Sequence, residues 1–273
     1  MRLARAGTLF SPAADVLAGT CLVGLESWGL SSIRILVASV LLYAAGMILN
    51  DHADREQDAT TRPERPIPAG QISPSFAWIL GVACLVGCIA TSPIRTYHGA
   101  MILLVLGYDY ILKSSTPLGA VTMGCLRGMN LLSPAVFAGS ELGQLIVPSA
   151  VYAIYIVSVT LLGALEDAPR VQRRVVLGLI SIPPLSASLA IYAQPSPWPA
   201  AGIAFGLSAV FLLWGRQQVW KTETMRAAMT WLLLGTMIYT GLLAMSHDRL
   251  FEALIILAAI MPARLIARRI SLT

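Results

Sequence analysis

Apolar runs separated by short polar, proline- or glycine-containing connections follow one another along almost the whole chain. Most of them are 17–22 residues long, enough for a helix rising about 1.5 Å per residue to cross a hydrocarbon layer about 30 Å thick. The pattern predicts an all-α, polytopic transmembrane bundle of nine or ten helices in one domain, residues 1–273. The runs cover residues 12–30, 32–49, 74–91, 98–112, 117–138, 144–165, 175–193, 199–215, 228–246 and 250–264.

The composition supports a membrane protein. Hydrophobic residues make up 56% of the 273 residues and charged residues 12%, and the mean hydropathy is +0.73. A soluble domain has about 25% charged residues. These values exclude a disordered chain, a coiled coil and an ordinary soluble enzyme. The four cysteines all lie inside apolar runs, which is typical of packing residues.

The net charge of +5 is divided into short clusters between the apolar runs, so the charges indicate membrane topology and no nucleic-acid partner. With ten spans and a cytoplasmic N-terminus, fifteen of the 19 Lys and Arg residues face the cytoplasm and three face the opposite side. This bias predicts that both termini are cytoplasmic. Arg2 and Arg5 precede the first run as in a signal peptide, but no cleavage site ends it convincingly, so we interpret it as the first span. The pattern suits a bacterial inner membrane.

The longest connection, residues 50–73, contains five of the 14 acidic residues. It continues directly from an apolar helix. If the helix runs on, Asp51, Asp54 and Asp58 fall within an arc of roughly 60°, with Asn50 at its border and Glu56 pointing away. Three carboxylates on one face repel each other, and Mg²⁺, a hard cation that shares its ligands with substrate phosphates, would offset that repulsion. The alternative is a solvated acidic helix end.

The second half of this connection contains three prolines and one glycine, which exclude a helix and stiffen the loop. Arg62 and Arg65 lie in it, and arginine forks match phosphate oxygens. Carboxylates with Mg²⁺ beside arginines would bind a diphosphate. The alternative for the arginines is ordinary anchoring at the cytoplasmic face.

Two motifs stand out. The first runs Asn50-Asp51-x-x-Asp54-x-x-x-Asp58, followed by Arg65-Pro66-Ile67-Pro68-x-Gly70. The second is Tyr108-x-x-x-x-Lys113. Both resemble motifs of the UbiA superfamily of intramembrane prenyltransferases, and the second is similar to a stretch whose lysine binds diphosphate in that family. The resemblance covers most of the chain and is loose after residue 215.

The resemblance implies a helical bundle with a cytoplasmic cap over a central cavity that is open to lipid. It also implies transfer of an isoprenyl group from a prenyl diphosphate to a small or lipophilic acceptor, with Mg²⁺ as the cofactor. Asp51, Asp54 and Asp58 would then serve as metal ligands and catalytic groups. Asn50, Arg62, Arg65, Tyr108 and Lys113 would bind substrate.

The second aspartate-rich motif of the family, usually DxxxD, is altered in this sequence. The corresponding segment reads Leu165-Glu166-Asp167-Ala168-Pro169-Arg170. Glu166 stands for the first acid and is expected to bind metal, with Asp167 beside it as a further catalytic candidate. Arg170 replaces the second acid and is expected to contact phosphate. The change suggests a divergent branch, of which the Ebo-cluster members are one candidate.

Charged and amide side chains inside apolar runs usually face a cavity or a partner. Arg127 and Asn130 lie on one face of the predicted fifth span and are candidate substrate-binding residues, although Arg127 in an ion pair is an equal alternative.

Other functions remain open: a non-catalytic isoprenoid-binding relative, a terpene cyclase of the same fold, or a transporter. A CDP-alcohol phosphotransferase would need a DGxxAR pattern, which this sequence lacks. The sequence indicates neither the acceptor nor the oligomeric state.

Overall fold

The computed structural model describes residues 8–139, 142–166 and 172–271. Its regular structure in these ranges is helical, as predicted. The helices are α1 (Phe10–Leu22), α2 (Leu30–Ala53), α3 (Arg55–Thr61), α4 (Pro74–Thr91), α5 (Arg95–Tyr110), the short 3₁₀ helix η2 (Leu112–Ser114), α6 (Thr116–Ala138), α7 (Leu142–Ala164), α8 (Arg173–Tyr192), α9 (Ala200–Gln217), α10 (Thr222–Met245), α11 (Leu250–Ala258) and α12 (Ile260–Ser271).

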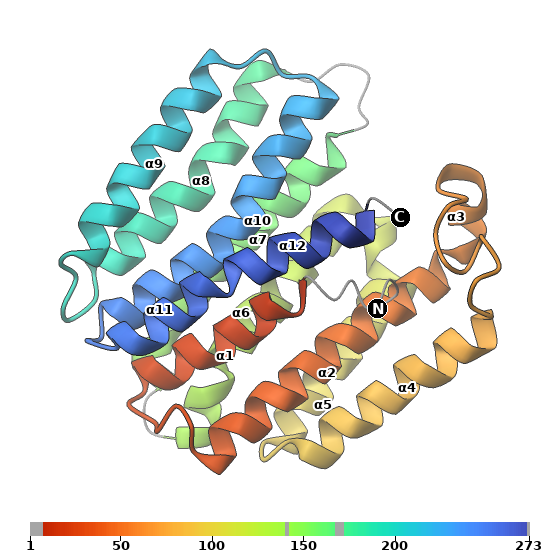
Figure 1. Cartoon of the computed structure of the whole chain (residues 1–273), viewed down its shortest axis with the longest axis horizontal. Helices are drawn as coiled ribbons and strands as arrows, with labels where there is room; N and C mark the ends of the chain where they lie inside the picture. Colours follow the sequence, from red (N-terminus) through yellow and green to blue (C-terminus); the bar gives the residue numbers. More distant parts are fainter. Residues whose placement is uncertain (1–7, 140–141, 167–171, 272–273) are drawn as a thin grey trace.

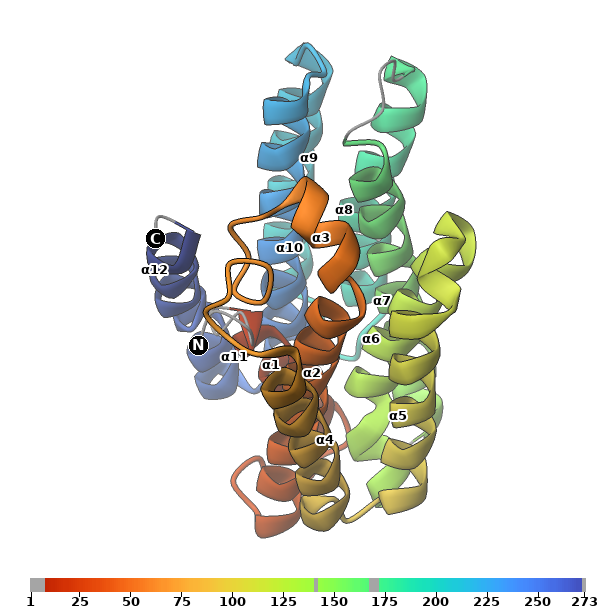
Figure 2. The same cartoon turned by 90° about the vertical axis from the view of Figure 1, so that its right-hand side faces the viewer.

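The long helices form one bundle with α1 near its middle (Figure 1). On one side of α1, α2 packs against α4 and α5; on the other, α7 to α10 pack together. α1 contacts α2, α6 and α10, so it joins the two halves. The short helix α3 lies at one end of the bundle, beyond the end of α2 (Figure 2).

Six helices in the described ranges are long and apolar enough to cross a membrane. They are Leu30–Ala53, Pro74–Thr91, Gly143–Ala164, Arg173–Tyr192, Ala200–Gln217 and Thr222–Met245. Each overlaps one predicted span, and the shorter helices α1 and α5 fall on two more. The predicted tenth span is divided between α11 and α12, which meet at Ala259, so the number of membrane crossings stays a prediction.

Two glycines let α6 and α7 pack backbone to backbone. A Cβ atom on Gly124 would lie 2.6 Å from the carbonyl oxygen of Ala153, and one on Gly128 would lie 2.8 Å from that of Ser149. No side chain larger than hydrogen fits at such distances. This close approach explains how Arg127, which lies between the two glycines, comes within reach of Tyr152 on α7.

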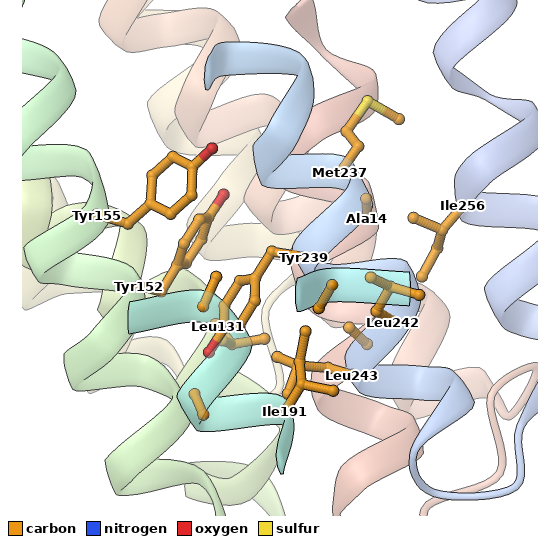
Figure 3. Packing of buried hydrophobic residues seen from close by; sticks show 14 of the residues in the cluster. Ala14, Leu131, Tyr152, Tyr155, Ile191, Met237, Tyr239, Leu242, Leu243 and Ile256 are labelled. Carbon is orange, nitrogen blue, oxygen red and sulfur yellow. The ribbon is translucent and has the colours of Figure 1, made fainter. Parts of the chain in front are cut away.

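The largest buried cluster lies where α1 and α6 to α11 meet. Figure 3 shows three tyrosines side by side in it. The ring of Tyr152 lies 6.3 Å from that of Tyr155 and 5.6 Å from that of Tyr239, measured between centroids. Tyr155 and Tyr239 also line an apolar cavity of about 520 Å³ between α7, α8, α9 and α10.

Candidate active site

The acidic segment forms a nearly continuous extension of α2, as the sequence predicted. Asp54 is both the C-cap residue of α2 and the N-cap residue of α3. Helical hydrogen bonds persist through it, from Asp54 N to Asn50 O at 2.9 Å and from Asp58 N to Asp54 O at 2.8 Å. The Asn50 amide also donates to Asp54 Oδ2 at 3.1 Å. The segment therefore holds its carboxylates in the register of a helix.

Arg65 joins two of these carboxylates. Its Nη1 lies 2.6 Å from Asp58 Oδ2 and 3.4 Å from Asp51 Oδ1, so the two oxygens are at most 6.0 Å apart, the sum of these distances. Asp51 and Asp58 are 5% and 4% exposed. The loop that carries Arg65 folds back through turns, one of them ending at Gly70, whose φ of 71° suits a residue without Cβ. Asp51, Asp54 and Asp58 together are called the acidic face below. Arg65 pairs with this face, as predicted.

Lys113 reaches the same face from a distant part of the sequence. It lies in η2, directly after α5. Its Nζ is 2.5 Å from Asp54 Oδ1 and donates to Asn50 Oδ1 at 2.9 Å. Lys113 and Arg65 thus hold the three aspartates from two directions.

Two neighbouring side chains are exposed to solvent. The side chain of Glu56 is 86% exposed and pairs with Arg55 at 3.1 Å, in agreement with the helical geometry that turned it away. Arg62 is exposed on the loop. Of the two loop arginines, Arg65 therefore contacts the acidic face, whereas Arg62 has an exposed side chain.

A small cavity of about 70 Å³ lies among α1, α2, α5 and α6. Tyr108 and Asp109 line it near the end of α5, and Arg127 and Asn130 line it from the middle of α6. The remaining wall is largely apolar and includes Tyr43 and three methionines, Met47, Met101 and Met123. The cavity therefore begins at the helix that leads to Lys113 and extends into the membrane-spanning part of the bundle.

Arg127 is held in a buried ion pair. Its Nη2 lies 3.1 Å from Asp15 Oδ2 and also donates to the hydroxyl of Tyr152. Asn130 donates to Asp15 Oδ2 at 2.9 Å and Tyr152 donates to Asp15 Oδ1 at 2.9 Å. Arg127 follows the start of α6 by eleven residues, which corresponds to about 16 Å along the axis. The ion pair therefore lies deep in the bundle, at the end of the cavity away from Lys113.

The altered second motif is only partly described. Glu166 lies in the turn after α7 and forms an ion pair with Arg226 of α10. Asp167 and Arg170 lie outside the described residues, so their predicted roles stay predictions.

The donor chemistry at the acidic face suits Mg²⁺, because it consists of carboxylate and amide oxygens. In the described part of the chain, no three carboxylate, imidazole or thiolate groups are arranged as a metal site. Arg65 and Lys113 bind the carboxylate oxygens instead. Both cations are also groups that bind phosphate. The oxygen ligands of this group are thus of the kind that Mg²⁺ takes, and its two cations are of the kind that phosphate takes.

Asp109 was not among the predicted site residues. It is 2% exposed, it lines the cavity, and its Oδ2 has no hydrogen-bond partner among the described residues. One signal in the sequence was available: Asp109 is an acid at the end of an apolar run, inside the motif that runs from Tyr108 to Lys113. Its burial and the missing partner needed the structure.

Comparisons with known proteins show the family of the chain. A model of the UbiA prenyltransferase family matches residues 16–269. Digeranylgeranylglyceryl phosphate synthase from Methanothermobacter thermautotrophicus is 35% identical over 121 residues, covering 40% of this chain and 41% of the relative. This alignment therefore spans about two fifths of the relative's length.

Two solved structures share the fold. A structure reported for digeranylgeranylglyceryl phosphate synthase in membranes has a TM-score of 0.66 at 17% identity, covering 91% of this chain and 97% of the other. The apo structure of a UbiA homologue from Aeropyrum pernix K1 has a TM-score of 0.61 at 19% identity, covering 93% and 96%. At such identities the likeness shows the fold alone.

Proposed function

The chain belongs to the UbiA prenyltransferase family, and from that premise we propose that it transfers an isoprenyl group from a prenyl diphosphate to an acceptor, with Mg²⁺ as its cofactor. Its family and its six apolar helices make it an integral membrane protein. The acceptor is small or lipophilic.

The charge balance of the acidic face supports a requirement for metal. Asp51, Asp54 and Asp58 carry three negative charges and Arg65 and Lys113 carry two positive ones, so the group keeps one net negative charge. A diphosphate would be repelled by this face alone. A divalent cation held by Asp51, Asp54 and Asp58 would reverse the sign of the local charge, so that a diphosphate would be attracted.

Each residue of the group has a role in the proposed reaction. Bound Mg²⁺ supplies charge stabilisation for the departing diphosphate. Lys113 and Arg65 donate to phosphate oxygens and stabilise the negative charge that grows as the carbon–oxygen bond breaks. Asn50 orients Lys113 and Asp54, and Tyr108 lines the cavity. We propose Glu166 as a further metal ligand, Asp167 as a further catalytic group, and Arg62 and Arg170 as further phosphate-binding residues.

The cavity below this group is proposed to take the prenyl chain. Its volume of about 70 Å³ is less than the roughly 150 Å³ that holds one benzene molecule. The chain would enter by displacing Met47, Met101 and Met123, whose unbranched side chains adapt readily to new shapes. Arg127 and Asn130 would meet the far part of the chain, and a rigid, fully paired network there gives the cavity a fixed end.

The observation that carries the proposal is the meeting of three helix-borne aspartates with Arg65 and Lys113 directly above a membrane cavity. The test is diphosphate release by the purified protein in detergent from C10, C15 and C20 prenyl diphosphates, with Mg²⁺ or with EDTA. We expect release only with Mg²⁺. Asp54→Ala is expected to reduce the rate at least 100-fold, the size of effect that removal of one transition-state contact produces.

Glu56→Ala is the matched control, because it removes a carboxylate two residues away whose side chain is 86% exposed. We expect a change of less than about twofold, since surface substitutions away from a site usually have small effects. Equal losses in both variants would contradict the proposed role of the acidic face. Absence of release in the wild-type protein, with membrane lipid extract supplied as acceptor, would instead favour a binding protein.

In this proposal the acidic face and both termini lie on the cytoplasmic side of a bacterial inner membrane. The distribution of Lys and Arg supports that orientation. A reporter enzyme that works only in the cytoplasm is expected to be active when fused to the C-terminus. Activity of a fused reporter that works only in the periplasm would contradict the proposed orientation.

A further inference from the structure

We propose that Asp109 is a catalytic residue that binds the nucleophilic group of the acceptor and takes its proton during prenyl transfer. This inference rests on the proposed function and adds the group that handles the second substrate.

The position of Asp109 separates it from the other acids of the site. It lies on α5, four residues before Lys113, and it interacts electrostatically with Lys113, Asp54 and Asp51. It therefore lies close to where the diphosphate would bind. Among the described residues that line the cavity, Asp109 is the one carboxylate.

The hydrogen bonding of Asp109 is incomplete. Its side chain is buried, and its Oδ2 has no hydrogen-bond partner among the described residues. Leaving a buried carboxylate oxygen unpaired is costly, and such oxygens usually bind a water or a ligand or take part in catalysis. A hydroxyl, amine or other proton-bearing nucleophile would provide the missing donor.

The other acids near the cavity are already occupied. Asp54 and Asp58 each pair with a cation, and Asp51 lies 3.4 Å from Arg65. Asp15 accepts from Arg127, Asn130 and Tyr152. An ionised carboxylate that is fully hydrogen-bonded is a poor proton acceptor, because protonation would break those contacts. Asp109 has an oxygen to offer without losing any described contact.

The chemistry of transfer requires such a group. The bond between C1 of the prenyl group and the bridging oxygen breaks, and both electrons leave with the diphosphate. An electron pair of the acceptor forms the new bond to C1, and the acceptor becomes positively charged until it loses a proton. Asp109 Oδ2 takes that proton and becomes a neutral carboxylic acid, so the positive charge never stays in the apolar cavity. The proton then passes to water, which regenerates the carboxylate.

The test compares two rates in one reaction. Wild-type protein and Asp109→Asn are incubated with farnesyl diphosphate, Mg²⁺ and an extract of the source cells that contains lipids and small molecules. Diphosphate release reports ionisation. Mass spectrometry reports farnesylated product and free farnesol. For Asp109→Asn we expect release within about threefold of wild type, product lowered about 100-fold, and farnesol increased correspondingly, as water captures the cation.

Two further variants separate catalysis from structure. Asp109→Glu keeps the carboxylate and is expected to restore part of the product. Asp248→Asn, which changes an acid in the connection between α10 and α11, is expected to leave both rates unchanged. A merely structural role would lower release and product together in Asp109→Asn and would not be rescued by glutamate.

Several results would overturn the inference. If Asp109→Asn loses release as Asp54→Ala does, Asp109 acts in ionisation. If it keeps full transfer, Asp109 has no part in the reaction. Release without any farnesylated product in the wild type would leave no acceptor for Asp109 to bind. By contrast, no release in the wild type would mean that the proposed function itself fails.

Discussion

Removing Arg127 alone should destabilise the protein strongly, whereas removing it together with Asp15 should cost much less. Asp15 is fully buried and its two oxygens accept from Arg127, Asn130 and Tyr152. In Arg127→Met the carboxylate keeps its two neutral donors and loses its countercharge. Breaking one side of a buried ion pair costs about 3–5 kcal/mol, which corresponds to a fall of about 6–20 °C in Tm for a chain of this size.

The double variant Asp15→Leu/Arg127→Met removes both charges. The remaining cost comes mainly from the Tyr152 hydroxyl, which loses its hydrogen bonds with Arg127 and Asp15. An unsatisfied buried hydroxyl costs about 1–3 kcal/mol. The double variant is therefore expected to be at least about 2 kcal/mol more stable than the sum of the single variants, a coupling typical of residues in one network.

Thermal unfolding in detergent measures these stabilities, with Tyr152→Phe as a further variant to separate the hydroxyl from the charges. Diphosphate release by the double variant then tests where Arg127 acts. Because Arg127 lies about 16 Å along α6 from its start, ionisation should persist. Two results would refute the reasoning: a cost below about 1 kcal/mol for Arg127→Met, or strictly additive losses.

Three other outcomes follow from the same geometry. Lys113→Met should lower the rate of diphosphate release about 100- to 1000-fold, because one donor to the leaving group is lost. The amount of inorganic diphosphate at successive times after mixing measures this rate, and a rate near that of the wild type would contradict the prediction. Gly128→Leu should destabilise the protein by at least about 1–3 kcal/mol, since a Cβ there would lie 2.8 Å from the Ser149 carbonyl oxygen. Gly206→Leu, at a helical glycine with nothing within 4 Å of its Cβ, is the matched control in the same unfolding experiment, and equal effects would count against the packing argument. Removal of Mg²⁺ by EDTA should abolish diphosphate release, and addition of excess Mg²⁺ should restore it. Release that persists in EDTA would show that the aspartates work without a metal.

The sequence predicted the fold class well because apolar periodicity over long runs depends little on tertiary detail. It located the spans that became α2, α4, α6, α7, α8, α9 and α10 to within a few residues at most ends. The boundaries of the first and last spans were less accurate. Gly24, with φ of 68°, follows soon after the end of α1, and the run after residue 250 contains the junction at Ala259. Such local features do not appear in hydropathy.

The acidic face was also accessible from sequence, since helical register alone groups Asp51, Asp54 and Asp58. The contacts that complete it were not. Lys113 was proposed from a motif resemblance, but its bonds to Asp54 and Asn50 depend on how α5 packs against α2. The same limit applies to Asp15, whose partners come from two other helices.

The most direct test of the central claim is the fate of the prenyl group. Wild-type protein is given a deuterated prenyl diphosphate, Mg²⁺ and the cell extract, and released diphosphate is compared with the labelled products resolved by mass. The account predicts one labelled acceptor molecule for each diphosphate released. Label found mainly in cyclic hydrocarbon or free prenyl alcohol, with none in an acceptor, would contradict prenyl transfer.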